Sequence, residues 1–439
     1  MHDKIQVNLS CTHDKRGDGM NHSVIKRVIF DQIEVIREAE ITSRDYSFEK
    51  GMNYVLVGLR RAGKSTLLYK LAKDLVESGC DWSQIIYVNF EDDRLLGFTM
   101  EDFNDILEVS YELCDRKDIY YFFDEIQVVD GWEHFARRMA DQKKHVYITG
   151  SNAKMLSSEM EAVLGGRYLS KMIMPFSFGE ACTHKATEHD EEALLTSSKI
   201  GKIRRTCQEY LSHGGLPEAQ GLSNKREYIK SVYEKVLLGD IATREKIKNP
   251  AALRLMMKKI AETVMHEISF NTLAGNVKAT GIKTSTDSMI EYTSFAENAY
   301  LLFRTRNFVS KFAEKENVPR LYFYDNGMLA LFLVDKAPVL LENAVAVHLK
   351  RKYSDEIYYY KSRQTGIDID FYLPDEGTAI QVAYRLEGSE EREIGNLLSF
   401  AQKKEDVRHL IIVTNEEETI IKKDGFEIEV VPIHRFLLG

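Results

Sequence analysis

The chain carries, at residues 54–66, the stretch Tyr54-Val55-Leu56-Val57-Gly58-Leu59-Arg60-Arg61-Ala62-Gly63-Lys64-Ser65-Thr66. Its apolar start is typical of a buried parallel strand. The eight residues from Gly58 to Ser65 fit the pattern Gly-x-x-x-x-Gly-Lys-Ser, and an amphipathic segment runs on from Thr66 to Glu77. A strand, a glycine loop and a helix in this order predict a phosphate-binding loop.

The residue types in this loop suit a chain of phosphates. Glycines let the backbone turn its N–H groups inward, and the helix N-terminus adds a partial positive charge. Lys64 would bring a mobile cation to the outer phosphates, and the Ser65 hydroxyl would bind Mg²⁺. We expect the cofactor to be bound by Gly58, Leu59, Arg60, Arg61, Ala62, Gly63, Lys64, Ser65 and Thr66.

A second motif follows at Ile119-Tyr120-Tyr121-Phe122-Phe123-Asp124-Glu125, an apolar strand that ends in two acids. It has the form of a Walker B element. Asp124 would hold the magnesium ion through water, and Glu125 would orient and activate the attacking water.

Two other strand ends carry polar residues, and each has two interpretations. The strand 85–90 ends in Glu91-Asp92-Asp93-Arg94, which is either acidic support for magnesium or a solvated strand end. The strand 145–150 is followed by Ser151-Asn152. Ser151 either senses the terminal phosphate or caps a helix over 153–160.

Arg167 follows Gly165-Gly166 beyond that helix. We interpret Arg167 as a finger that neutralises charge in the transition state, in its own or a neighbouring subunit. The alternative is a surface arginine after a glycine turn.

Length and composition set further limits. The 439 residues are too many for one core, and 44% hydrophobic with 29% charged residues is typical of a globular protein. A net charge of −9 argues against general coating of nucleic acid. The five widely spaced cysteines indicate a reducing compartment, and no apolar run is long enough to span a membrane. These features predict a cytoplasmic protein.

The motifs together resemble a family of bacterial and archaeal AAA-type ATPases with a C-terminal region of unknown function. The resemblance rests on the phosphate loop, Phe123-Asp124-Glu125-Ile126-Gln127, Trp132-Glu133, Thr149-Gly150-Ser151 and Gly166-Arg167. It implies ATP and Mg²⁺ as ligands. In that family the segment Pro175-Phe176-Ser177-Phe178-Gly179-Glu180 closes the ATPase core. Tyr210-Leu211-Ser212-His213-Gly214-Gly215-Leu216-Pro217-Glu218 and Leu238-Gly239-Asp240-Ile241 resemble the opening of its C-terminal region.

The resemblance extends to two modules in the C-terminal half. Helical patterns at 270–277 and 283–292, then strands around a loop with Lys311, Lys315 and Arg320, outline a winged helix. Such a module would place Lys283, Thr284, Ser285 and Ser288 in a DNA groove, although winged helices also bind proteins.

The last hundred residues resemble a restriction-endonuclease-like α/β core. Glu342 and Asp370 match its metal-binding acids, but Gln381 and Ala383 stand where a carboxylate and a lysine are needed. We therefore expect no nuclease activity.

The sequence thus predicts an α/β chain of five segments. They are a disordered tail (1–20, with Met1 or Met20 as the start), an AAA-type P-loop ATPase domain (21–185), a linker and helical segment (186–255), a winged helix (256–335) and a degenerate nuclease-like domain (336–439). We expect an ATP-hydrolysing switch, able to form homo-oligomers, that repositions the C-terminal module to engage a protein or DNA partner. The alternative is an interaction or DNA-binding protein that holds ATP with little turnover.

Overall fold

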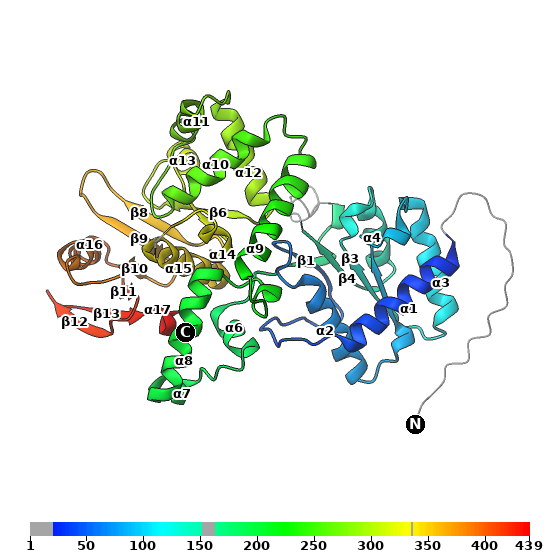
Figure 1. Ribbon diagram of the computed structural model, residues 1–439. Coiled ribbons are helices and arrows are strands. Elements are labelled where there is room, and N and C mark those ends of the chain that lie inside the picture. The colour runs from blue at the N-terminus through cyan, green and yellow to red at the C-terminus, as the bar shows by residue number, and fades with distance from the viewer. Residues whose placement is uncertain (1–20, 152–162, 335–336) are drawn as a thin grey trace.

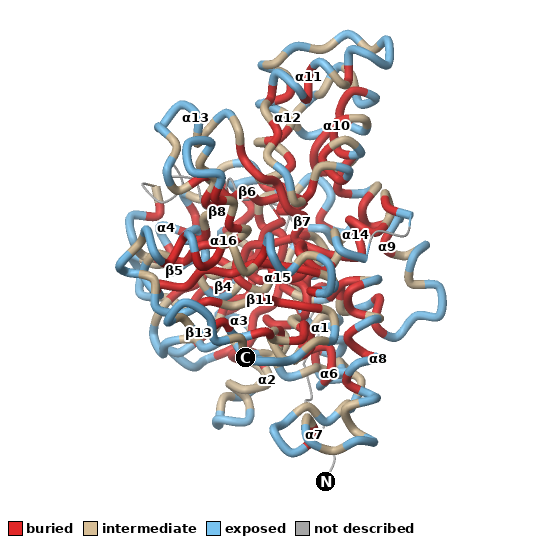
Figure 2. The backbone as a smooth tube through the Cα atoms, turned by 90° about the vertical axis from the view of Figure 1, so that its left-hand side faces the viewer, coloured by how far each residue is buried: buried red, intermediate tan, exposed pale blue. Residues whose placement is uncertain are grey.

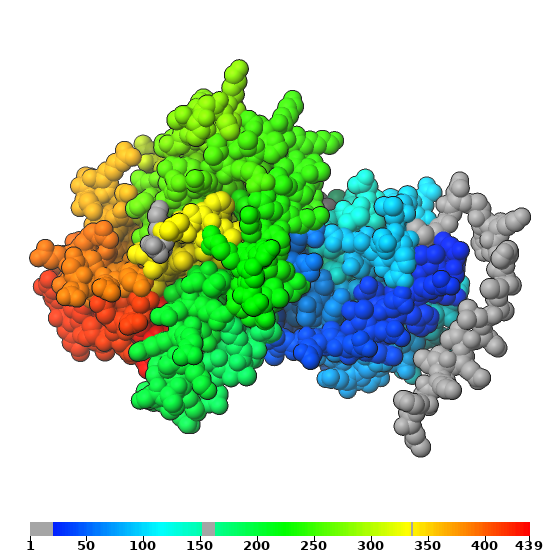
Figure 3. Space-filling model, in the orientation of Figure 1, coloured from blue at the N-terminus to red at the C-terminus, as the bar shows by residue number. Residues whose placement is uncertain are grey.

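The computed structural model describes residues 21–151, 163–334 and 337–439. Two sheet-centred halves pack against each other, with a group of helices between them (Figures 1 and 3). The predicted tail 1–20 and the helix predicted over 153–160 lie outside the described residues.

The N-terminal half is built on a five-stranded parallel sheet with the strand order β2-β3-β4-β1-β5. Its strands are β1 (Asn53–Val57), β2 (Ile85–Asn89), β3 (Tyr120–Asp124), β4 (His145–Gly150) and β5 (Tyr168–Met172). Every residue of β1 is buried, as expected of a parallel strand covered on both faces. The predicted parallel P-loop sheet is therefore confirmed.

Helices cover both faces of this sheet. One face packs on α1 (His22–Glu38), α3 (Phe103–Leu113) and α4 (Trp132–Asp141). The other packs on α2 (Lys64–Glu77). Because all five strands are parallel, the residues that follow their carboxyl ends meet at one edge, and this edge is where the phosphate-binding loop lies.

The middle of the chain is helical rather than an exposed connection. It contains α6 (Phe178–His184), α7 (Glu191–Leu195), α8 (Ser197–His213), α9 (Lys225–Glu234) and a π-helix (Lys235–Thr243). Within the segment 186–255, predicted as a linker and helical segment, α7 begins at Glu191 and α8 at Ser197. The polar residues of 187–205 form the outer face of these helices, while Ala193 and Ile203 are buried on the inner face.

The C-terminal half is built on a mixed eight-stranded sheet with the order β12-β13-β11-β10-β9-β8-β6-β7. Its strands are β6 (Leu302–Asn307), β7 (Arg320–Phe323), β8 (Tyr358–Lys361), β9 (Asp368–Leu373), β10 (Thr378–Val382), β11 (His409–Thr414), β12 (Thr419–Lys423) and β13 (Phe426–Pro432). The hairpin β6–β7 joins the later strands because β6 pairs with β8, through Arg306 with Tyr358 and Asn307 with Tyr359. The two segments predicted to divide at 335–336 therefore share one sheet.

Three helices precede the hairpin and extend away from the sheet (Figures 1 and 2): α10 (Pro250–Thr263), α11 (Phe270–Ala279) and α12 (Thr286–Asn298). Among the later helices are α13 (Phe312–Asn317), α14 (Asn326–Ala330), α15 (Ala337–Tyr353), α16 (Glu390–Lys403) and α17 (Ile433–Phe436). Buried positions concentrate on the strands and on the helix faces that cover them (Figure 2). In the described part of the chain, no helix has the length and apolar character needed to cross a membrane.

Candidate nucleotide-binding site

The loop between β1 and α2 is shaped by two glycines. Gly58 has φ 144°, and a Cβ at this position would lie 2.0 Å from the carbonyl oxygen of Ile173. Gly63 has φ 93° and precedes the first residue of α2 without a side-chain cap on the helix N–H groups. A side chain at Gly58 would displace the backbone, and the uncapped helix start leaves N–H donors for an anion.

Lys64 is buried and folded back over this loop. Its Nζ donates to the carbonyl oxygens of Gly58 (3.0 Å) and Leu59 (3.2 Å) and lies 4.0 Å from Oε1 of Glu125. Burial lowers the pKa of Lys64, and the charges of Glu125 and Asp124 partly offset this effect. The ammonium group thus lies between the loop and the acids at the end of β3.

The two acids at the end of β3 are held by side chains of neighbouring strands. Asp124 accepts a hydrogen bond from the hydroxyl of Tyr87 (2.8 Å) and another from Thr149. The Glu125 N–H donates to Thr149 Oγ1 (3.0 Å), and the Glu125 carboxylate accepts a bond from Gln127. Burial and the charge of Asp124 raise the pKa of Tyr87, which keeps this hydroxyl a donor.

Mg²⁺ prefers hard oxygen ligands, and the site offers them. Ser65 carries a hydroxyl at the start of α2, and Asp124 is a carboxylate only 2% exposed. A buried carboxylate next to a single ammonium favours a further cation, so the residues present fit a magnesium ion.

Ser151 follows β4 at the same sheet edge. It is buried, and its Oγ has no hydrogen-bond partner among the described residues, as is also true of Gln127 Oε1. Buried polar atoms are nearly always bonded, so these two are available to a ligand. The alternative role of Ser151 as a helix cap concerns residues outside the described ranges.

Arg167 lies at the opposite edge of the sheet. It immediately precedes β5, which runs parallel to β1, and its Nε donates to Asp141 Oδ1 (2.5 Å) at the end of α4. The phosphate-binding loop leaves the other end of β1. The structure therefore does not bring Arg167 to Lys64 and Asp124 of the same chain, and its role in a neighbouring subunit stays a prediction.

The acidic segment after β2 divides into two parts. Glu91 pairs with Arg60 of the loop (Nη2–Oε1 2.9 Å), whereas Asp92 pairs with Arg94 in a local turn (Nη2–Oδ2 2.8 Å). Of this segment, Glu91 is the residue in contact with the phosphate-binding loop.

Sequence reasoning missed three groups that contact the loop from outside it. Asp240 binds Arg60 (Nε–Oδ2 3.0 Å), and Glu218 binds Arg61 (Nη1–Oε1 2.8 Å). Arg44 donates to Ala62 O (2.8 Å), Met174 O (2.7 Å) and both carboxylate oxygens of Glu180 (2.9 and 3.0 Å). Asp240 and Glu218 lie in the two motifs that open the C-terminal region. Their place in these motifs was the only feature of the sequence that singled them out.

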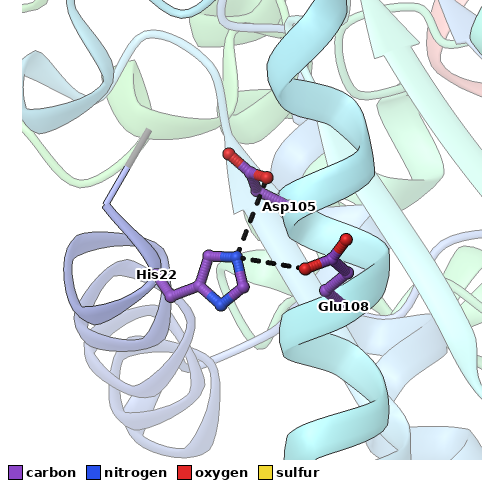
Figure 4. Close-up of side chains that lie close together, drawn as sticks. All are labelled: His22, Asp105 and Glu108. Carbon is purple, nitrogen blue, oxygen red and sulfur yellow. Dashed lines mark ion pairs between the residues drawn. The ribbon is translucent and has the colours of Figure 1, made fainter. Parts of the chain in front are cut away.

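A separate group of metal-ligating residue types joins α1 to α3 (Figure 4). His22 Nε2 lies 3.7 Å from Asp105 Oδ1 and 3.6 Å from Glu108 Oε2. Glu112 also bonds to the His22 ring, and Lys26 pairs with Glu112. With a lysine in the group and all side chains partly exposed, we interpret it as ion pairing between two surface helices.

The acids predicted from the nuclease resemblance surround an arginine. Arg320 is 2% exposed, and its guanidinium donates to Asp370 Oδ1 (3.2 Å) and Asp368 Oδ1 (2.7 Å). Glu342 accepts from the hydroxyl of Tyr322 (2.9 Å), and its other oxygen has no partner among the described residues. Arg320 was predicted on the loop between two strands of the winged helix, but it is the first residue of β7, and its charge is buried among carboxylates.

The neutral residues at the two remaining positions are also buried. Gln381 accepts from the Asp370 N–H (2.8 Å) and donates to Asp368 O (3.0 Å) and Glu393 Oε2 (2.9 Å). Ala383 packs in the core beneath α16. A guanidinium and an amide thus occupy the region where a working metal site of this type needs an ion and a carboxylate.

Comparison with known proteins identifies two regions. Residues 50–182 match the family described as "AAA domain", and residues 204–338 match the family described as "Domain of unknown function (DUF8612)". An uncharacterized protein of Methanocaldococcus jannaschii is 28% identical over 433 residues, covering 94% of this chain and 95% of that protein. An uncharacterized protein of Haemophilus influenzae is 27% identical over 384 residues, covering 85% and 92%.

Solved structures are only distantly similar. The Aeropyrum pernix ORC1 protein in complex with DNA shares 12% identity, with 74% of this chain and 93% of that chain covered and a TM-score of 0.27. AMPPCP-bound DnaA from Aquifex aeolicus shares 14%, with 62% and 87% covered and a TM-score of 0.24. Residues 50–182 thus carry an AAA domain and residues 204–338 a domain of unknown function, and uncharacterized proteins similar over most of their length occur in an archaeon and a bacterium.

Proposed function

We propose that the chain binds ATP with magnesium at the loop between β1 and α2, hydrolyses it, and uses the nucleotide state to reposition its C-terminal half. The observation that carries this proposal is the convergence of Lys64, Asp124 and Glu125, with Lys64 Nζ 4.0 Å from the Glu125 carboxylate. The hydroxyl of Ser151 at the same edge, which has no partner among the described residues, adds a donor for a terminal phosphate.

Each side chain has a separate task in this mechanism. Lys64 would leave the carbonyl oxygens of the loop and bind the outer phosphates. Ser65 and Asp124 would hold Mg²⁺, which lowers the negative charge of the phosphates when bound. Glu125, fixed by Thr149 and Gln127, would orient the attacking water and take its proton.

The finer description of the C-terminal half belongs to the same proposal. The order α11, α12, β6 and β7 supports a winged helix, and the Glu342–Asp370 pair on α15 and β9 supports a nuclease-like domain. We expect no DNA cleavage, because Arg320 and Gln381 occupy the metal-binding region. The partner that this half engages, protein or DNA, would be distinguished by comparing ATP turnover with and without each.

The test of ATP use is a set of three variants. Lys64→Ala should lower the affinity for Mg–ATP at least about tenfold, because it removes the cation that faces the phosphates. Glu125→Gln should bind ATP like the wild type and hydrolyse it at least about a hundredfold more slowly. Lys70→Ala, a matched control on the same helix whose lysine pairs with Asp74, should change neither value.

Titration calorimetry measures the affinities, and phosphate release measures turnover. Equal affinity of wild type and Lys64→Ala would overturn the assignment of the loop. If the wild type binds ATP but shows no turnover with either class of partner, the chain is instead an interaction protein that holds ATP, which is the alternative function.

A further inference from the structure

The phosphate-binding loop contacts the helical middle of the chain through its own arginine. Arg60 Nε donates to Asp240 Oδ2 (3.0 Å), and Nη2 donates to Glu91 Oε1 (2.9 Å). Asp240 lies in the π-helix Lys235–Thr243, more than 50 residues beyond the end of the matched AAA region at 182. The contact therefore joins two parts of the chain that are distant in sequence.

Arg60 also lies close to the other charged groups of the site. Burial has the largest effect on the pKa of Lys64 and lowers it. The charge of Arg60 also lowers this pKa, whereas the charge of Asp240 raises it. A guanidinium four residues before the loop lysine is thus within electrostatic reach of the place where phosphates would bind. Guanidinium groups pair in two-point geometry with phosphate as well as with carboxylate groups.

We propose that Arg60 is a phosphate-sensing side chain, and that Asp240 is the carboxylate from which a bound terminal phosphate withdraws it. This inference rests on the proposed function, since it requires ATP in the loop. It assigns to Asp240 the role of a positioning residue that reports the nucleotide state to the C-terminal half.

The surroundings of the pair allow such an exchange. The side chains of Arg60 and Asp240 are 16% and 7% exposed, so an unpaired Asp240 would be costly. Asp240 has a second cation nearby, Arg244, whose Nη2 lies 3.9 Å from Oδ1 on the next turn. Glu91 is 42% exposed and can turn into water. Both carboxylates therefore keep a partner or solvent when Arg60 moves to the phosphate.

Binding measurements on the wild type and four variants test this exchange. Asp240→Asn removes the competing charge. The ratio of the affinity for a non-hydrolysable ATP analogue to the affinity for ADP should therefore rise about fivefold. In Arg60→Met protein, the further change Asp240→Asn should have no effect on that ratio. Glu218→Gln is the matched control, because it removes a carboxylate of the same region that binds the exposed Arg61, and the ratio should stay at the wild-type value.

A second measurement uses the wild-type chain. Hydrogen exchange across residues 235–243 should be faster with the ATP analogue than with ADP, because the analogue frees Asp240. An unchanged ATP-to-ADP ratio in Asp240→Asn, a ratio change that persists in Arg60→Met, or equal exchange with both nucleotides would each overturn the inference. If ATP binding is lost in Lys64→Ala while any of these results is obtained, the Arg60–Asp240 exchange is wrong but the proposed ATP site stands. Failure of the inference can therefore be told from failure of the proposed function.

Discussion

One guanidinium, that of Arg320, neutralises the acidic residues at the centre of the C-terminal half. Its partners Asp368 and Asp370 lie on β9, and Glu342 approaches from α15. Removing one partner of a buried ion pair destabilises the fold strongly, because the other charge stays buried and unpaired. Arg320 is therefore needed for the stability of this half and is not available to bind DNA.

Glu342 gives this cluster a measurable pH dependence. Burial, with a contribution from Asp370, raises the pKa of Glu342 to about 8, although Arg320 opposes the shift. An unfolded glutamate has a pKa near ~4.3. Between these two values the folded chain holds a proton that the unfolded chain releases, so the free energy of unfolding falls as pH rises and levels off above about 8.

We predict that Glu342→Gln removes most of this fall. The free energy of unfolding of the wild type, measured with denaturant, should fall by about 1–3 kcal/mol between pH 6 and pH 8.5. The variant should lose much less, because the amide has no proton to release and its oxygen can still accept from Tyr322. Glu387→Gln, an exposed control, should follow the wild type. Equal pH dependence of wild type and Glu342→Gln would contradict the prediction.

Among single residues, the positions of those that lie in local motifs could be predicted from the sequence. Lys64, Asp124 and Glu125 stand at fixed places in a loop and at a strand end, so their neighbourhood could be inferred from topology. Arg44, Asp240 and the burial of Arg320 could not be inferred. Each depends on a long-range charge pair, and such pairs leave no periodicity in the sequence.

Among the connecting elements, the turn at Gly214-Gly215 fixes how the two halves join. A Cβ on Gly215 would lie 2.2 Å from the carbonyl oxygen of Phe176, and the Gly215 carbonyl accepts from the Phe176 N–H (2.7 Å). The side chain of Asp325 completes the turn by accepting from the Gly215 N–H (2.7 Å). The glycine is needed for close backbone approach.

We predict that Gly215→Ala destabilises the chain by about 1–3 kcal/mol, because the new methyl group meets backbone that cannot move aside. Gly221→Ala is the matched control, since nothing lies within 4 Å of the position that its methyl group would take and its φ is not positive. The control should stay within about 0.5 kcal/mol of the wild type. Thermal unfolding compares the two, and equal melting temperatures would contradict the prediction.

Elements were predicted well where periodicity was strong and poorly where it was not. The strand over 145–150 was predicted at its observed bounds, because its apolar run is bounded by polar residues on both sides. The pairing of β6 with β8 was not predicted, because it involves two residue pairs whose partners are about 50 positions apart. Sheet membership of this kind depends on packing, and local residue preferences do not encode it.

At the level of the whole molecule, the location of Arg167 bears on whether it could complete the nucleotide-binding site of its own chain or that of a neighbouring subunit. Within one chain it faces Asp141 at the sheet edge opposite the loop. In a ring or dimer, however, that edge of one subunit could face the loop of the next, as a finger in trans requires.

We predict that Arg167→Ala and Glu125→Gln proteins, each with low turnover, regain activity when mixed. A mixed assembly brings an intact Arg167 from one subunit to an intact Glu125 in the other. The measurement is phosphate release across mixing ratios, with Arg137→Ala, which lies in an exposed pair with Asp141, as the control for a charge change on the same surface. No recovery at any ratio would show that Arg167 is a surface arginine.

The shared eight-stranded sheet also limits how this chain can be divided. A fragment that begins at Ala337 would lack β6 and β7, so the free edge of β8 would be open to pairing with another chain. It would also lack Arg320, which leaves the buried carboxylates of Glu342 and Asp370 without their nearby guanidinium. Such a fragment would tend to aggregate, whereas one that begins ahead of β6 retains both the edge and the counter-charge. Any evolutionary exchange of the C-terminal part among relatives would meet the same restriction, and would have to carry the hairpin with it.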